Sequence, residues 1–109
     1  MRIHTENITL DDTDVLAGTS LDTLESGGQL DLFVLSTQAD TVMDITGPDN
    51  EPIAQNVEIQ QETRAIRPTD DVPFSLVIAT GGHYTINIDI VTAATVPFMA
   101  IYRKAGTDY

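Results

Sequence analysis

The stretch PFSLVIATGGHYTINIDIVTAATVPFMAIYRK, residues 73–104, decides the fold class, because it holds three apolar runs separated by two short breaks. The first break, at residues 80–82, contains two glycines, which accept the positive φ of a tight turn. From residue 83 the pattern becomes an alternation of polar and apolar residues, the period of a half-covered β-strand. The stretch therefore predicts three consecutive antiparallel strands.

The strand expected at residues 83–90 has two chemically different faces. One face is apolar and should lie in the core, and it carries Tyr84, Ile86, Ile88 and Ile90. The other face is polar and should meet solvent or a partner, and it carries His83, Thr85, Asn87 and Asp89. In the following strand, which begins at Val96, alternate residues from Val96 to Tyr102 should again share one face.

Four further strands are expected upstream, at residues 3–10, 29–37, 41–46 and 53–60. The first is short and suits a sheet edge, whereas residues 29–37 are apolar on both faces, which is typical of a covered central strand. We expect residues 41–46 to pair with residues 29–37 across a short turn, with Met43 and Ile45 inward and Asp44 in solvent.

The remaining segments are expected to be irregular. After a turn at Asp11, Asp12 and Asp14, residues 16–28 should wrap the core without forming a regular strand, anchored by Leu16, Leu21 and Leu24. Two prolines make residues 47–52 a loop. The polar residues 61–72 form a long loop or a crossover between sheets, where function is often located.

These patterns together predict one all-β domain over residues 1–109, a single antiparallel β-sandwich of about seven to eight short strands, of which the jelly roll is one form. Polar terminal arms are expected at about residues 1–7 and 104–109. A chain of 109 residues is long enough for one hydrophobic core.

The charge is strongly acidic: 17 acids against 5 bases give a formal net charge of -12. Such a surface repels phosphate backbones, so we do not expect the protein to bind nucleic acid. Twelve of the acids are aspartate, lysine occurs once and threonine fifteen times. This composition is typical of a protein adapted to high salt, and the alternative is an acidic protein kept soluble by its charge.

The sequence contains no cysteine, which removes disulfides and thiolate chemistry. Neither a signal peptide nor a transmembrane segment is expected, because no apolar run is long enough.

No catalytic or metal-binding signature is present. His4 and His83 are far apart in sequence, and a metal site would require them to converge with a carboxylate such as Asp89. The four serines lie in no nucleophile motif. We therefore expect a non-enzymatic protein with no catalytic residues, no metal site and no cofactor.

Association with other proteins is the expected activity, through three groups of residues. The first is the polar face formed by His83, Thr85 and Asn87, the second is the cationic pair Arg103 and Lys104, and the third is Arg64 and Arg67 in the polar loop. Cations on an acidic chain can bind the acidic surface of a like molecule.

Glycine turns lead into regular threonine-rich strands in three stretches, LAGTSLDTL, ITGPDNEPI and GGHYTINIDIV. In this the chain resembles the small all-β structural proteins of tailed phages and archaeal viruses that decorate or cement capsids. The resemblance implies a homo-oligomer, often a trimer, that binds capsid or other virion proteins at the particle surface, without nucleic acid or membrane as a partner. The alternative is a carbohydrate-binding or adhesin-like sandwich, although such modules usually expose tryptophan or several tyrosines, and this chain has no Trp and three Tyr.

Overall fold

The computed structural model describes residues 1–38, 40–61 and 74–104, which form eight strands and no helix. Seven strands have five or more residues and one, β5, has two. The strands are β1 (Arg2–Ile8), β2 (Gly28–Ser36), β3 (Val42–Thr46), β4 (Pro52–Glu58), β5 (Gln60–Gln61), β6 (Phe74–Ile78), β7 (Thr85–Asp89) and β8 (Val96–Lys104).

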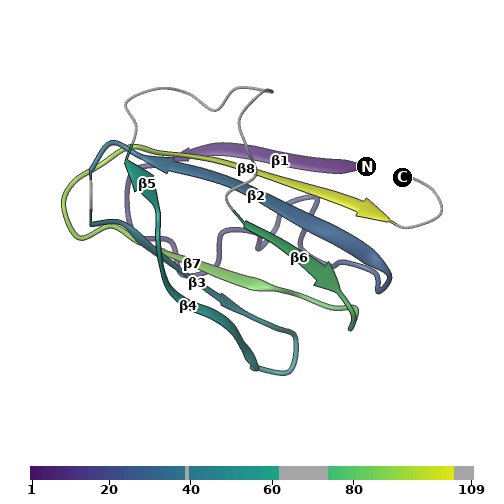
Figure 1. Cartoon of the computed structure of the whole chain (residues 1–109). Helices are drawn as coiled ribbons and strands as arrows, with labels where there is room; N and C mark the ends of the chain where they lie inside the picture. The colour runs from purple at the N-terminus through teal and green to yellow at the C-terminus, as the bar shows by residue number, and fades with distance from the viewer. Residues whose placement is uncertain (39, 62–73, 105–109) are drawn as a thin grey trace.

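The strands form two sheets that lie as layers on either side of one core (Figure 1). The larger sheet has the order β1-β8-β2, and both β6 and β5 pair with β2 at different parts of its length. The smaller sheet has the order β4-β3-β7. All ladders are antiparallel except the two-residue pairing of β5 with β2. The predicted all-β sandwich is confirmed.

The strand pairs are nested around the β3–β4 hairpin. Moving outward along the chain, β2 pairs with β6, the segment at Asp12 bridges to Ile88 of β7, and β1 pairs with β8. Nested antiparallel pairs shared between two sheets are the connectivity of a jelly roll. A complete jelly roll has eight long strands. Here the strand that would pair with β7 on this side is reduced to the single bridge of Asp12 with Ile88, and Val15 N adds one further hydrogen bond, of 3.0 Å, to the Ile86 carbonyl.

Two expectations about strand neighbours were wrong. Residues 29–37 do not pair with residues 41–46, because β2 and β3 belong to different sheets. The three strands β6, β7 and β8 are present but do not pair with one another; β6 pairs with β2, β7 with β3, and β8 with β1 and β2. The β2–β3, β6–β7 and β7–β8 connections instead cross from one sheet to the other, which lets these strands bury an apolar face against the opposite layer.

The core is built from the alternate residues that the pattern predicted. Met43 and Ile45 are buried while Asp44 is half-exposed, and Tyr84, Ile86 and Ile88 are buried on one face of β7. The wrapping segment is also confirmed, since Leu16, Leu21 and Leu24 are at most 1% exposed. In the structure the wrapping segment covers residues 9–27, between β1 and β2. It completes the hydrophobic core although it contains no regular strand.

The central strand β2 is covered on both faces, as predicted. Leu30, Leu32 and Val34 belong to the core between the sheets. Phe33 and Leu35, which point to the other face, are also buried. This explains why β2 reads as a continuous apolar run.

The N-terminal residues do not form the expected polar arm. Residues 2–7 belong to β1, which pairs with β8 over seven residues, from Arg2 opposite Tyr102 to Ile8 opposite Val96. The ladder and the stacking of the Arg2 guanidinium on the Tyr102 ring, 4.9 Å from its centroid, hold these polar residues in place. At the other terminus Lys104 ends β8, and residues 105–109 lie outside the described part.

Candidate functional site

The outer face of β7, the edge strand beside β3 in the smaller sheet, is polar, as predicted. Thr85 and Asn87 are half-buried and pair in register with Thr46 and Asp44 of β3. The Asp44 carboxylate is engaged by the neighbouring strand, since it accepts a 2.7 Å hydrogen bond from Asn56 N. This face offers hydroxyl, amide and carboxylate groups but no exposed apolar anchor.

His83, the third residue predicted for this face, instead joins two parts of the fold. Its Nε2 lies 2.7 and 2.9 Å from the two carboxylate oxygens of Asp14. Its Nδ1 lies 2.6 Å from the Asp22 carbonyl oxygen and 2.9 Å from Asp22 Oδ1. All four oxygens are acceptors at neutral pH, so both ring nitrogens must carry protons and the ring is an imidazolium.

The pKa of His83 is raised above the ordinary value of 6.5. Partial burial acts to lower the pKa, but the hydrogen bonds to Asp22 and Asp14 and the charges of these two carboxylates outweigh it. The ring therefore links the β6–β7 turn to the wrapping segment by charge-assisted hydrogen bonds. Its bonding groups are directed inward, toward this chain.

The cationic pair at the end of β8 is also partly engaged. Arg103 Nη1 donates to Asp31 Oδ2 at 2.7 Å, and the Asp31 side chain is only 7% exposed. Ser75 Oγ and Gln29 Nε2 donate to the other oxygen, at 2.6 and 2.8 Å. Lys104 is exposed beside it, in register with Gly28. Arg103 is therefore tied to the buried carboxylate of Asp31, whereas Lys104 keeps its side chain at the surface.

Arg64 and Arg67, the remaining residues predicted for an interface, lie outside the described residues. The structure does not bring the described candidates together into a single patch. His83, Thr85 and Asn87 are on or beside the smaller sheet, whereas Arg103 and Lys104 end a strand of the larger sheet.

The edge strands β1 and β4, one in each sheet, carry features that discourage pairing with another strand. On β1, Arg2, His4 and Glu6 alternate with exposed residues and share the face of the buried Ile8. On β4, Pro52 lacks an N–H, Asn56 has a φ of 54°, and the ladder with β3 contains two register shifts. Inward charges, proline and bulges are the usual means of protecting sheet edges.

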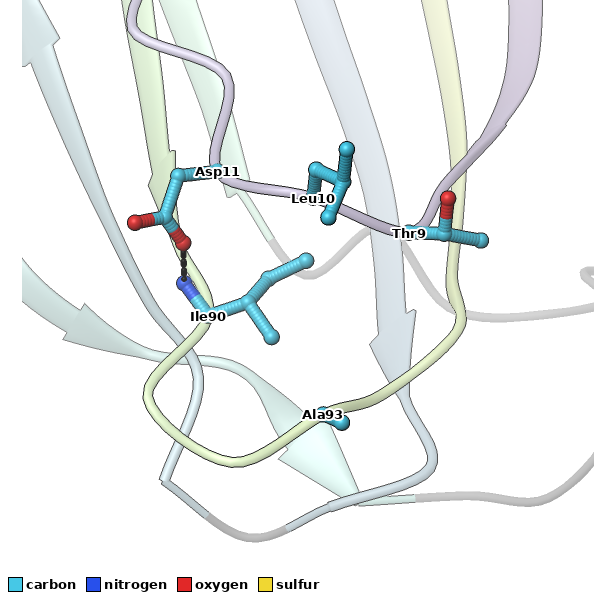
Figure 2. Close-up of a pocket in the computed structure, with 5 residues that line it drawn as sticks. All are labelled: Thr9, Leu10, Asp11, Ile90 and Ala93. Atoms are coloured by element: carbon cyan, nitrogen blue, oxygen red, sulfur yellow. Dashed lines mark hydrogen bonds between the residues drawn. The ribbon is translucent and has the colours of Figure 1, made fainter.

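A surface hollow that the sequence reading did not identify lies at the end of the sandwich, where β1 leads into the wrapping segment and β7 turns toward β8 (Figure 2). Its volume is about 480 Å³, and it is lined by Thr9, Leu10, Asp11, Ile90 and Ala93. Asp11 Oδ1 accepts a 2.7 Å hydrogen bond from Ile90 N, which holds the two segments together. We call this feature the end hollow.

Exposed aliphatic side chains lie in or beside the end hollow. Leu10 is 79% exposed and Val91, between Ile90 and Ala93 in the chain, is 68% exposed. One signal in the sequence could have found it: Ile90 and Val91 are consecutive apolar residues after a strictly alternating strand, so one of them must leave the core.

The aromatic and nucleophilic residues of the described part have structural partners. Tyr84 and Tyr102 are 3% and 2% exposed, and their hydroxyls donate to the Thr80 and Glu25 carbonyl oxygens. Ser36 is buried against Thr41, with 2.8 Å between the hydroxyl oxygens. Tyr84 and Tyr102 therefore cannot serve as flat platforms for a sugar.

The described residues contain neither a cluster of metal-ligating side chains nor a membrane-spanning helix. Across residues 1–38, 40–61 and 74–104, no group of three or more His, Asp or Glu side chains is arranged to hold a metal ion. Within the same residues there is no helix of the length and apolar character needed to cross a membrane.

No protein-family model, no curated protein and no solved structure matches this chain. Function must therefore be inferred from the surfaces of the sandwich themselves.

Proposed function

We propose that this protein is a non-enzymatic structural component of a virus particle, which decorates or cements the capsid through contacts with capsid proteins and with copies of itself. The observation that carries the proposal is the end hollow, where Leu10 and Val91 expose aliphatic surface on a protein with a net charge of -12. Exposed apolar surface surrounded by polar groups is typical of a protein-interaction site.

The fold supports the same role. Jelly rolls occur in capsid and lectin domains, and the protected edges of β1 and β4 favour contacts through strand ends and loops rather than through uncontrolled strand addition. A small contact suffices on a capsid, because many copies on a lattice gain strength from multivalency.

The carbohydrate-binding alternative has less support from the described residues. Sugar sites in sandwiches use exposed aromatic rings, and here Tyr84 and Tyr102 lie in the core. Tyr109 lies outside the described residues.

The experiment is to purify virus particles from the natural source on a density gradient and to follow the protein by mass spectrometry. We expect it to co-migrate with the major capsid protein at a fixed ratio and to be released by mild destabilisation of the particle. A protein found only in particle-free fractions contradicts the proposal, and binding to a glycan array in place of particles would favour the alternative.

A further inference from the structure

The described cations gather at the end of the molecule opposite to the end hollow. Arg2 begins β1 and Arg103 and Lys104 end β8, and in Figure 1 these strand ends lie on one side while the β7–β8 turn lies on the other. Met1 and Ile3, at the same end, are 62% and 47% exposed. We call these five residues the cationic end.

The end hollow has the complementary charge. Four aspartates lie in or next to the segments that form it, and residues 9–12 and 89–93 contain no Lys or Arg. Asp11 lines the hollow, Asp12 follows it, Asp89 precedes Ile90, and Asp40 accepts a 2.7 Å hydrogen bond from Thr92 Oγ1. The aliphatic surface is therefore surrounded by negative charge.

One molecule cannot bring these two ends together. They terminate the same β1–β8 ladder, whose seven residue pairs separate them by about 20 Å at roughly 3.3 Å per residue. Electrostatic screening over about 8 Å at physiological salt makes each end act by its local charge rather than by the net charge of the chain.

From this geometry we infer that the end hollow receives the cationic end of a second copy of this chain. Ile3 and Met1 would bring aliphatic side chains to Leu10, Ile90 and Val91, and the cations would approach the aspartates around the hollow. The inference rests on the self-association contained in the proposed function and names its two surfaces.

The charges also decide between the two ways in which copies can associate. Joining two end hollows places four aspartates against four aspartates, which is unfavourable. Joining two cationic ends opposes the three cations of each copy, a weaker repulsion because Arg2 and Arg103 already pair with Glu25 and Asp31. Only the head-to-tail arrangement joins opposite charges. Such an interface uses two different patches, so it produces a closed ring or an open chain of copies rather than a two-fold dimer.

The cations already have partners within the chain, and these leave room for a second copy. Arg2 Nη2 contacts Glu25 Oε2 at 3.3 Å, where the two side chains are 34% and 58% exposed. The Arg103 side chain remains 33% exposed after pairing with Asp31. Arg2 Nη1 also donates to the Ser20 and Thr23 carbonyl oxygens, at 3.1 and 3.2 Å, so a second copy would meet the exposed parts of two side chains that are already held in place.

The test is light scattering after size-exclusion chromatography of two single variants, Val91→Asp in the end hollow and Ile3→Asp at the cationic end, at about 0.15 M salt. The wild type should exceed the monomer mass, and each variant alone should be monomeric. Mixed together they should form a complex of two chains and no larger species, because each variant keeps one intact end.

Matched controls use exposed residues outside both ends. Val77→Asp on β6 and Ile53→Asp on β4 replace side chains that are 74% and 38% exposed, and both should associate like the wild type. Asp89→Lys should weaken association roughly tenfold or more, whereas Asp49→Lys in the β3–β4 turn should not. Circular dichroism melting of every variant checks that it is folded.

The inference would be overturned by a wild type that is monomeric at every concentration, by a mixture of the two variants that remains monomeric, or by a Val77→Asp control that dissociates like Val91→Asp. A two-fold dimer unaffected by Ile3→Asp would do the same. None of these results touches the proposed binding to particles, which the density gradient tests separately.

Discussion

The Nε2 atom of His83 lies within 2.9 Å of both carboxylate oxygens of Asp14, a residue 69 positions earlier in the chain. Asp22 binds the opposite ring nitrogen. The charged groups of the wrapping segment that contact the ring are Asp14 and Asp22. The Asp12 carboxylate accepts a hydrogen bond from Asp14 N. Asp49 and Glu51 of the β3–β4 turn act on Tyr84 instead. A single protonated ring thus holds residues 9–27 against the β6–β7 turn.

This contact makes stability depend on pH. Because the pKa of His83 is raised in the folded state, its stabilising contribution is fully present below the unfolded pKa of about 6.5 and is lost as the pH rises through the folded pKa. The difference in melting temperature between the wild type and His83→Gln should therefore be larger at about pH 6 than at about pH 9. His4→Gln is the control, since the His4 ring bonds Glu6 of the same strand, β1. Equal differences at both pH values would contradict the role of the imidazolium.

The ion pair of Arg103 with Asp31 should respond differently to the removal of each partner. Arg103→Gln leaves a carboxylate that is 7% exposed without its cation and should cost about 1–3 kcal/mol of unfolding free energy. Asp31→Asn leaves Arg103, which is 33% exposed and can turn to water, so the cost should be about 1 kcal/mol or less. Urea unfolding at neutral pH measures both, and a larger loss for Asp31→Asn would show that the hydrogen bonds to Gln29 and Ser75 dominate.

The wrapping segment should contribute as much stability as a regular strand. Leu16→Ala or Leu21→Ala removes a side chain with 0% exposure and should cost about 2–5 kcal/mol. Leu10→Ala, in the same segment but 79% exposed, is the matched control and should change the free energy by less than about 0.5 kcal/mol. Equal costs for the three variants in urea unfolding would contradict the described packing.

Salt should stabilise this protein. With 17 acids and 5 bases, the folded chain carries strong self-repulsion, and added salt shortens its range to about 3 Å at 1 M. The melting temperature is expected to rise steadily with sodium chloride. A flat or falling curve would favour the simpler reading, in which the acidity serves only solubility.

Most of the secondary structure could be predicted because the chain alternates clearly. The strand expected at residues 83–90 is β7, Thr85–Asp89, and the one expected at 29–37 is β2, Gly28–Ser36. Alternation is a local property, so the sequence reveals where a strand runs and which face it buries. It also identified the three leucines that anchor the wrapping segment.

Strand pairing could not be predicted in the same way. The short link between β2 and β3 suggested a hairpin, yet the two strands lie in different sheets. The choice depends on which apolar faces meet across the core, which is a property of distant residues.

The candidate site shows the same limit. His83 was expected on an open face, but its ring bonds two aspartates of the wrapping segment that the alternation of β7 does not involve. The end hollow depends on Leu10 and Ala93 meeting from segments about eighty residues apart, which the β1–β8 ladder, the Asp12–Ile88 bridge and the Asp11–Ile90 hydrogen bond bring together.

The nested pairing also decides the order in which this chain can be completed. Its innermost pair, β3 with β4, joins neighbours in sequence, whereas its outermost pair joins β1 to β8 from nearly opposite ends of the chain. Closing the longest loop costs the most entropy, so assembly is expected to proceed from the central hairpin outward. Among the described strands, β1 is synthesised first and its partner β8 last, so β1 waits longest for its pairing. Both surfaces of the inferred contact between copies lie at the ends of that ladder, so neither is complete until the last strand is in place.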